Sequence, residues 1–497
     1  MKRILTVLMM TTALSGCNLA PDFKLPGLSK PEAFREAQEP LKETGAWKVG
    51  EPAAHQDRGT WWGVFNDPVL DALQTQAASG NLGVQAMEAR VRQSRAAAGE
   101  VRARFFPTLD ADASATRQKP SAISRGLQPG TDVSIENSLK TGMSFGYELD
   151  LFGRVRNSHK AAKAELMSAE STLQSMRLAM QADVADLYFL IRALDREQGV
   201  LATSVTLRED SLNILNKRLE IGTITELDIA EATVDLENTR IQYQSVIQSR
   251  KEAEHALALL LGKAPSEFSL EKADLTQRVP VIPAGLPSSL LERRPDISAA
   301  QYTLAAENAR IGVARAAFFP SISLTGNAGY ESDVMSNLFN WSSRTWALGP
   351  MVTLPIFSGG ANTKALERQK AVYEEAVANY SQTVLGAFRD VEDSLSRLKT
   401  LSQQSYAQEV AEKAANRASY LAETRYENGD VGYLEAITAR RNALEAQRSG
   451  IQFQGERLRE TVRLIRAIGG AWDAPAAGAT PAETPASVSE PVQPKRD

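Results

Sequence analysis

Two short stretches decide the fold of this chain: RFFP at Arg104–Pro107 and AFFP at Ala317–Pro320. Their first phenylalanines lie 213 residues apart (318 − 105 = 213), and residues that alternate between apolar and polar follow each stretch. A second pair, RLEIG at Arg218–Gly222 and RYENG at Arg425–Gly429, recurs at a spacing of 207 residues (425 − 218 = 207). Matches on this scale indicate an internal duplication, so we expect a molecule with two similar halves.

The alternating residues predict a pair of β-strands in each half, because successive side chains of a strand point to opposite faces. Strands about ten residues long have the length that crosses a bilayer on a tilt. The predicted hairpins span 107–149 and 320–355, with polar loops at 117–137 and 331–345.

After each hairpin, apolar residues recur every three or four positions, a pattern typical of helices that pack as coiled coils. The first such pattern continues for about 67 residues, which at 1.5 Å per residue predicts a helix roughly 100 Å long. Gly222 and Gly429 interrupt the two longest patterns, and Thr225 with Asp228 has the spacing of a capping box. The sequence predicts long helices at 154–220 and 360–426 and returning helices at 225–261 and 432–468.

The repeats and the local composition divide the chain into segments. The last segment is rich in Ala, Pro, Thr and Glu, a composition that predicts disorder. The predicted segments are a signal peptide at 1–16, a tether with an equatorial segment at 17–66, a first repeat at 67–262, a linker at 263–286, a second repeat at 287–469 and a disordered tail at 470–497.

The composition excludes several classes of function. Of the 497 residues, 43% are apolar and 23% are charged, and a formal net charge of −4 gives no reason to expect a nucleic-acid partner. The three histidines have no metal-ligand spacing, and the sequence shows no nucleophile motif or phosphate-binding loop. We therefore expect neither an enzyme nor a bound metal or cofactor, apart from a covalent lipid.

The start of the chain predicts export. Lys2 and Arg3 precede a short apolar stretch at 4–14, and LSGC follows at Leu14–Cys17. Cys17 is the only cysteine, so no internal disulfide can form. The position of Cys17 resembles a bacterial lipobox, in which the cysteine is lipidated after cleavage. The alternative is an ordinary signal peptide with a cysteine there by chance.

Four strands cannot close a barrel, and open strand edges are not tolerated in lipid. If the strands lie in a membrane, several copies of the chain must share one barrel, and a trimer would supply twelve strands (3 × 4 = 12). Phenylalanines at the junctions of strands and helices suit either an interfacial aromatic belt or an ordinary core. The alternative function is a lipid-anchored periplasmic coiled-coil scaffold without a pore, which would have no need of the strand pairs.

From Cys17 to about Trp472 the sequence resembles the TolC family of outer-membrane efflux proteins, most closely its lipoprotein branch serving RND-type pumps. The motifs that carry this resemblance are LSGC at Leu14–Cys17, Asp67-Pro68, RFFP at Arg104–Pro107, LDLFGR at Leu149–Arg154, Leu291–Ile297, Asn308–Ile322, Tyr426–Gly429 and Tyr433–Ala436.

The resemblance implies an α+β membrane protein in the bacterial outer membrane, lipid-anchored and with its helices in the periplasm. Its expected form is a trimeric 12-stranded β-barrel continued by a long α-helical tunnel. The implied partners are a periplasmic adaptor and an inner-membrane pump, and the implied function is a passive exit duct for drugs or other small toxic compounds.

The resemblance also places a periplasmic gate at the helical tips, around Gly222 and Gly429. A threefold ring of carboxylates there would attract cations, and a ring of leucines could close the pore by dewetting. A hydroxyl group on Tyr426 that reaches Asp228 on a neighbouring helix would hold the gate closed. The matching positions are Asp228, Glu231, Tyr426, Leu434, Glu435 and Thr438.

The sequence departs from the family pattern at one of these positions and at Val431 nearby. Thr438 lies where an acidic residue is common, and Val431 lies where the archetype has an arginine that holds the gate closed. We expect Glu435 to replace the missing acid. Ordinary roles remain open for these residues: a helix cap for Asp228, a solvated helix face for Glu231 and Glu435, and seam packing for Leu434.

Overall fold

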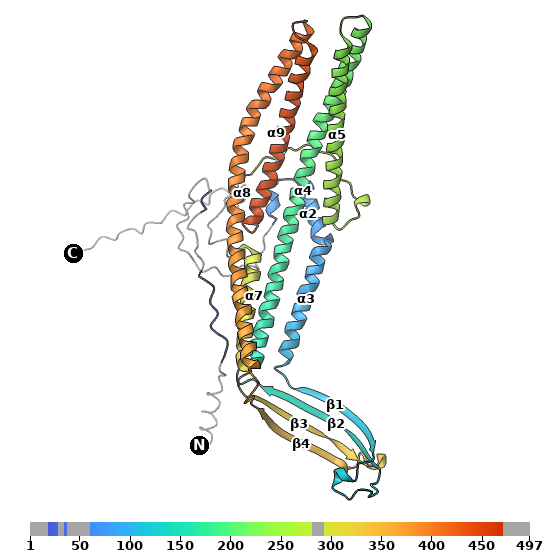
Figure 1. Cartoon of the computed structure of the whole chain (residues 1–497), viewed down its shortest axis with the longest axis vertical. Helices are drawn as coiled ribbons and strands as arrows, with labels where there is room; N and C mark the ends of the chain where they lie inside the picture. The colour runs from blue at the N-terminus through green and yellow to red at the C-terminus, as the bar shows by residue number, and fades with distance from the viewer. Residues whose placement is uncertain (1–17, 28–33, 37–59, 281–292, 471–497) are drawn as a thin grey trace, which may run out of the picture.

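The structure is a computed structural model that describes residues 18–27, 34–36, 60–280 and 293–470 (Figure 1). The predicted signal peptide, Cys17, much of the tether, part of the linker and all but the first residue of the predicted tail lie outside the described residues. A four-stranded sheet forms one end of the molecule, and the two longest helices extend from beside this sheet to the opposite end (Figure 1).

The two halves have the same helical plan. Each contains a helix of 22 residues before its strands, one of 67 residues after them and a returning helix of 35 residues. The helices are η1 (Trp61–Phe65), α2 (Pro68–Gly80), α3 (Leu82–Ala103), η2 (Ile123–Arg125), α4 (Arg154–Glu220), α5 (Glu226–Leu260), η3 (Pro265–Glu267), α7 (Pro295–Ala316), η4 (Met335–Asn337), η5 (Trp341–Ser343), α8 (Ala361–Glu427) and α9 (Tyr433–Ala467).

Glycines at left-handed backbone angles end the two long helices. Gly222 has φ 69° and Gly429 has φ 80°, a conformation that residues with a Cβ rarely adopt. After the first turn, the Thr225 side chain accepts a hydrogen bond from the Asp228 N–H while the Asp228 carboxylate accepts one from the Thr225 N–H. The predicted capping box is therefore confirmed, and the chain reverses at both tips.

The strands of the two halves join into one antiparallel sheet in the order β1-β2-β3-β4. Pairing of β2 with β3 connects the halves, while β1 and β4 form the two edges within a single chain. An edge strand presents backbone N–H and C=O groups that another strand can pair with. The strands are β1 (Thr108–Gln118), β2 (Glu136–Leu149), β3 (Ser321–Ser332) and β4 (Arg344–Thr353).

The hairpin loops are shorter than the sequence predicts. Arg117 and Asn137, assigned to the first loop, pair with each other in the sheet, and Glu331 of the second loop pairs with Lys140. The polar character of these residues predicted a loop. In the structure their polar groups pair between strands instead, as where Lys140 Nζ lies 3.0 Å from the Glu331 carboxylate. Such cross-strand charge pairs stabilise a sheet beyond its apolar part.

The main apolar core lies where the helices of both halves meet in the middle of the molecule. Trp61 and Phe65, which the sequence analysis places in the tether segment, form η1 and are buried in this core. Among the described residues, no helix combines the length and the hydropathy needed to cross a bilayer. Representative core residues are Leu70, Val184, Phe189, Leu304, Val391, Leu458 and Ile465.

The phenylalanines at the strand–helix junctions divide between the two proposed roles. The rings of Phe152 and Phe319 stack with their centroids 4.9 Å apart, and Phe105 contacts His159 edge-on at 5.5 Å. In contrast, Phe106 is 63% exposed and Phe357 is 90% exposed. The first group packs within the chain, whereas the second remains available to lipid or to another copy of the chain.

Candidate functional site

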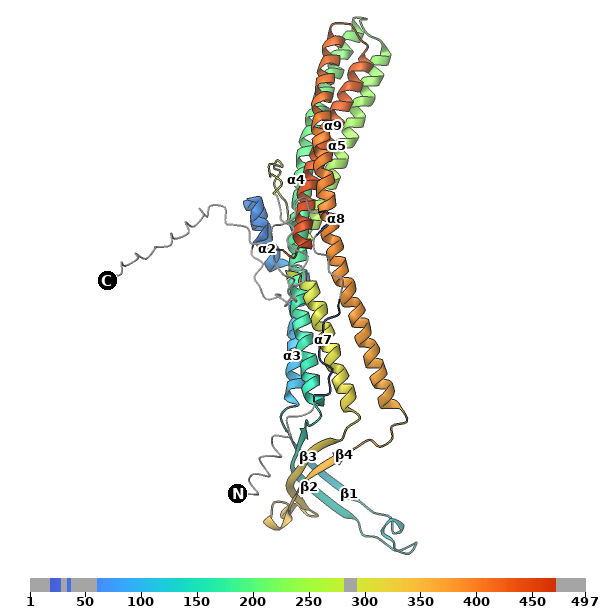
Figure 2. The ribbon, with the colours of Figure 1, turned by 90° about the vertical axis from the view of Figure 1, so that its left-hand side faces the viewer.

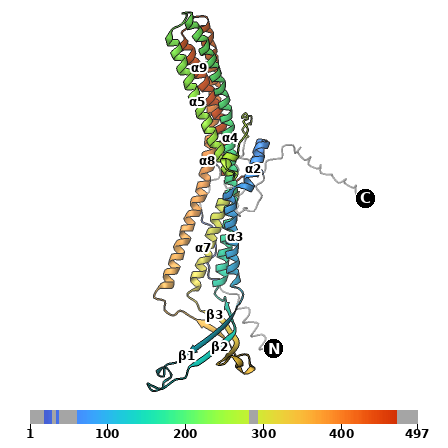
Figure 3. The same ribbon diagram turned by 90° about the vertical axis from the view of Figure 1, so that its right-hand side faces the viewer.

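The helical tips bring both halves of the chain together. The α4/α5 and α8/α9 hairpins both extend toward the end opposite the sheet (Figures 2 and 3), and side chains of α4 and α5 contact α9 there. A small apolar cluster connects them, and we call it the tip cluster. It consists of Leu215 on α4, Ala232 on α5, and Tyr433 and Ile437 on α9, with Tyr426 packed against it.

The structure does not join Tyr426 to Asp228 within one chain. The Asp228 carboxylate is occupied by the capping box, where it also accepts a hydrogen bond from the Thr225 hydroxyl at 2.8 Å. The Tyr426 ring lies 5.2 Å from the Tyr433 ring, and among the described residues its buried hydroxyl finds no hydrogen-bond partner. A contact between these side chains on different copies of the chain stays a prediction.

The other predicted gate residues lie on exposed helix faces. Glu435 pairs with Arg425 at 3.0 Å, and both side chains are 53% exposed, so this pair contributes little stability. Thr438 donates to the backbone carbonyl of Leu434, whose side chain is 55% exposed in an open, mostly apolar groove. Glu231 is partly exposed on α5. Whether these residues form threefold rings also stays a prediction.

Asp235, which the sequence analysis missed, is one of the buried carboxylates that link the two hairpins; Glu197 on α4 is another and accepts from Arg448 Nε on α9 at 2.9 Å. Asp235 is 3% exposed, and its two oxygens accept hydrogen bonds from Arg208 Nε at 2.8 Å and Arg441 Nε at 2.6 Å. Because Arg208 lies on α4, Asp235 on α5 and Arg441 on α9, one buried carboxylate holds three helices together. We call these three residues the Asp235 bridge.

The surroundings of the Asp235 bridge are rich in positive charge. Burial lowers the pKa of Arg208, whereas the Asp235 carboxylate raises it. The positive charges of Arg440 and Arg441 lower the pKa of Arg208 as well. Arg440 is paired with Glu423, and its guanidinium also lies 3.4 Å from the Ser211 hydroxyl. Asp235 is thus the acceptor that keeps a buried arginine neutralised at the junction of the two hairpins.

A sequence signal for this bridge existed. Arg208 and Asp235 occupy positions within the apolar periodicity of α4 and α5, where a seam residue is expected. Charged residues at seam positions are costly unless they are paired, so each indicates a partner. The partner on α9 could not be found this way, because Arg441 lies 206 residues from Asp235 in the chain.

A second buried charge cluster lies at the middle of the molecule. Asp195 accepts from Arg250 Nε at 2.7 Å and from Arg192 Nη1 at 3.1 Å, and all three side chains are at most 8% exposed. Arg250 and Arg192 also donate to the backbone carbonyls of Leu270 and Glu271, each at 2.6 Å. This cluster fixes the segment after α5 against α4 and α5.

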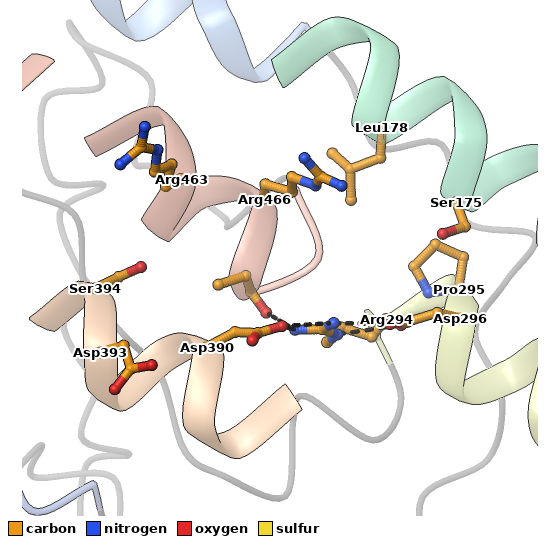
Figure 4. Close-up of a pocket in the computed structure, with 11 residues that line it drawn as sticks. Ser175, Leu178, Arg294, Pro295, Asp296, Asp390, Asp393, Ser394, Arg463 and Arg466 are labelled. Carbon is orange, nitrogen blue, oxygen red and sulfur yellow. Dashed lines mark hydrogen bonds and ion pairs between the residues drawn. The ribbon is translucent and has the colours of Figure 1, made fainter. Parts of the chain in front are cut away.

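A polar pocket near the middle is lined by residues from α4, α7, α8 and α9 (Figure 4). Arg294 reaches the Asp296 carboxylate at 2.7 Å, the Asp390 carboxylate at 3.3 Å and the Ala467 carbonyl at 3.0 Å. The pocket charges therefore neutralise one another and tie three helices of the second half together. Within the described part of the chain, no group of side chains is arranged to hold a metal ion.

Comparisons with known proteins agree with this architecture. The sequence profile of the family described as "Outer membrane efflux protein" matches residues 73–263 and 286–470, one stretch in each half. The toluene efflux pump outer membrane protein TtgF of Pseudomonas putida is 34% identical over 479 residues, which cover 93% of this chain and 96% of that protein.

Solved structures share the fold over nearly the whole chain. A membrane protein from Pseudomonas aeruginosa superposes with a TM-score of 0.82 at 32% identity, covering 91% of this chain and 100% of the other. The open state of the Neisseria gonorrhoeae MtrE outer membrane channel gives a TM-score of 0.78 at 28% identity, covering 91% of this chain and 98% of the other. The resemblance found in the sequence is confirmed, and the chain belongs to the outer membrane efflux protein family.

Proposed function

We propose that three copies of this chain form one continuous passive duct, the outer-membrane component of a tripartite efflux system. The observation that carries this proposal is the sheet: among the described residues, its edge strands β1 and β4 each pair on one side only, and nearly all of their side chains are exposed. Three such sheets, joined edge to edge, close a 12-stranded barrel and leave no open edge in the lipid. The helices continue the duct into the periplasm.

Exposed apolar residues on the first helical hairpin support the trimer. Leu207 and Ile214 on α4 and Ile221 directly after it lie seven residues apart, as do Leu227, Val234 and Ile241 on α5. Each of the six is at least 54% exposed in the single chain. A seven-residue apolar repeat is the pattern of a coiled-coil seam. In the assembled duct, a neighbouring copy of the chain covers these two stripes.

The cargo and partners follow from family membership. Because a relative is named as part of a toluene efflux pump, we assign to the duct small, apolar or amphipathic toxic compounds. An inner-membrane pump, of the RND type, supplies the energy, and a periplasmic adaptor connects it to the duct. The chain itself provides a path and performs no catalysis.

The helical tips form the gate of the duct. In the single chain, the Asp235 bridge and the tip cluster hold the α4/α5 hairpin against α9, which keeps the tips together. Opening requires the hairpins to separate, so the bridge must break or rearrange. The predicted rings of Asp228, Glu231 and Glu435 would then set the preference for cations at the entrance.

We expect substitution of Val234 by aspartate to abolish assembly, because it places a charge at the centre of an apolar seam. Cells that depend on this protein for efflux should then accumulate a fluorescent apolar dye, and the SDS-resistant trimer should disappear from gels. Thr233→Asp is the matched control, since Thr233 is an exposed neighbour outside the stripe. Full trimer yield and dye export by Val234→Asp would contradict the proposed seam.

We further propose that Cys17 carries the lipid that anchors each copy to the outer membrane. The expected result for Cys17→Ser is loss of radiolabelled palmitate from the protein, since no other cysteine is present. Cys17→Ala serves as a second variant with a different side-chain volume. Palmitate labelling that survives both substitutions would rule out lipid attachment at this position.

A further inference from the structure

The four-stranded sheet has one apolar face and one polar face. Residues that pair across an antiparallel sheet lie on the same face, so the register of the strands assigns every strand residue to one of the two. Phe145, for example, pairs with Leu109 on one side and with Gly326 on the other. Representative residues of the apolar face are Leu109, Met143, Phe145, Leu324, Leu348 and Val352.

The charged residues of the strands divide between these faces by sign. The polar face carries every strand carboxylate and one lysine: Asp110, Asp112, Glu136, Glu148, Glu331 and Lys140. Among the strand residues that the structure describes, the apolar face has only two charges, and both are arginines. They are Arg117, which pairs with Asn137, and Arg344, which pairs with Tyr330.

Both arginines lie at the end of the sheet next to the hairpin loops, away from the helices (Figure 1). From Arg344 the apolar face of β4 continues to Val352, eight residues farther along (352 − 344 = 8), or roughly 27 Å of strand. Tilted by about 35–45°, this length covers roughly 20 Å of depth, close to the apolar band of about 25 Å on outer-membrane barrels. In a duct that spans the membrane, Arg344 therefore lies at the outer boundary of the hydrocarbon.

The Arg344 guanidinium is held in place by a neighbouring tryptophan. Its Cζ lies 4.2 Å from the centre of the Trp341 ring, and its Nη1 donates to the Trp341 carbonyl at 2.9 Å. This bond uses one of the five N–H donors of the arginine. Trp341 and Trp346 are 73% and 75% exposed, and tryptophan is a side chain that favours the boundary between lipid and water.

The strands of a neighbouring copy offer no partner for these arginines. β1 and β4 are the edge strands, so in the closed barrel Arg117 and Arg344 lie beside the seam between copies. The neighbour presents the same apolar face there, and the described strands place no carboxylate on it. Within the described chain, neither arginine lies within ion-pair distance of a carboxylate. The anion that these guanidinium groups fit must therefore come from outside the barrel wall.

We propose that Arg117 and Arg344 bind the phosphate groups of phosphorylated lipids in the outer leaflet of the membrane. A guanidinium binds phosphate through two parallel N–H···O bonds, and Trp341 already orients that of Arg344. The acyl chains of the lipid then cover Trp346, Leu348 and Val352 below. This assignment rests on the duct proposed above, because only a membrane-spanning barrel brings this face against lipid.

Lipid binding to the purified trimer tests the assignment. The full-length trimer in detergent is titrated with diphosphoryl lipid A, and native mass spectrometry measures the bound fraction. We expect Arg117→Gln/Arg344→Gln to bind at least about tenfold more weakly than the parent, because charge-assisted hydrogen bonds to phosphate are lost. Dephosphorylated lipid A should bind the parent as weakly as diphosphoryl lipid A binds this variant. Trp341→Leu should weaken binding by about twofold to fivefold, the contribution of an exposed cation–π contact.

Lys119→Gln/Arg125→Gln is the matched control. It removes two positive charges at the same end of the sheet, but these pair within the chain with Asp132 and Glu136. Its affinity for diphosphoryl lipid A should equal that of the parent.

Two results would overturn the phosphate site and leave the duct intact. One is equal affinity of the parent and Arg117→Gln/Arg344→Gln trimers for diphosphoryl lipid A. The other is a lower dissociation temperature of that variant in lipid-free detergent with unchanged lipid binding, which would assign the arginines to contacts between copies. A parent protein that forms no trimer would refute the duct itself, and the lipid site with it.

Discussion

Replacement of Asp235 by alanine should open the helical tips. The substitution leaves Arg208, which is 5% exposed, without its carboxylate in the junction between α4, α5 and α9. Removing one partner of a buried ion pair costs about 3–5 kcal/mol, because the remaining charge is neither solvated nor neutralised. That free energy is lost from the state in which the hairpins are in contact, so the equilibrium shifts toward separated hairpins by at least about a hundredfold.

The measurement is single-channel conductance in planar bilayers, with uptake of a large hydrophilic antibiotic by intact cells as the second readout. We expect Asp235→Ala to conduct several times more than the parent and to sensitise cells to the antibiotic. Glu237→Ala is the matched control, since this carboxylate lies two residues away on α5 and its side chain is 53% exposed. A variant that conducts like the parent would show that the Asp235 bridge does not hold the gate.

A double substitution distinguishes the loss of an ion pair from the loss of packing. Arg208→Met/Asp235→Leu replaces both buried charges with apolar side chains of similar volume, a change that is often neutral or stabilising. Arg441 can turn toward water, because its side chain is already 44% exposed. We therefore expect the double variant to conduct less than Asp235→Ala and close to the parent.

The elements that the sequence predicted are those with an uninterrupted local pattern. The helix predicted at 154–220 has the bounds of α4, because a 67-residue periodicity ended by glycine leaves no other conformation that buries its apolar stripe. The strand alternation also placed both hairpins correctly, although it ended the strands too early at Arg117 and Glu331. Polar residues at those ends pair across strands, and a local pattern contains no information about a partner strand.

The candidate site was harder to predict because its contacts are long-range. The predicted residues cluster at the tips, but the structure assigns Asp228 to a helix cap and leaves the Tyr426 hydroxyl without a partner within the described chain. The buried link formed by Asp235 and Arg441 joins residues that are 206 positions apart, a spacing that no helical period predicts. Periodicity identifies the face on which a charge lies, whereas only the packing of two helices identifies its partner.

Substitution of Asp195 by alanine should have an equally large effect, but on stability rather than on gating. Asp195 is the carboxylate shared by Arg192 and Arg250, whose side chains are 3% and 8% exposed. Its loss leaves Arg192 without a carboxylate, at a cost of about 3–5 kcal/mol in each chain, whereas Arg250 keeps its ion pair with Glu254 at 2.7 Å. It also removes the acceptor for the Ala273 N–H, so the segment after α5 loses part of its attachment.

We expect Asp195→Ala to lower the temperature at which the SDS-resistant trimer dissociates and to expose the segment around Lys272 to trypsin. Asp183→Ala is the matched control on the same helix, because Asp183 pairs with Arg466 at 3.4 Å and the two side chains are 53% and 51% exposed. Exposed or partly exposed pairs contribute about 0–1 kcal/mol, so this variant should resemble the parent.

The two buried aspartates together test whether position or chemistry decides the outcome. Both substitutions remove a carboxylate that neutralises buried arginine, so a purely energetic view predicts the same phenotype for both. Asp235 lies near the tips, where two hairpins can separate while the rest of the molecule stays folded, whereas Asp195 lies where the helices of both halves share one core. Trimers of Asp195→Ala that survive should therefore conduct like the parent, and increased conductance in that variant would refute the assignment of the gate to the tips.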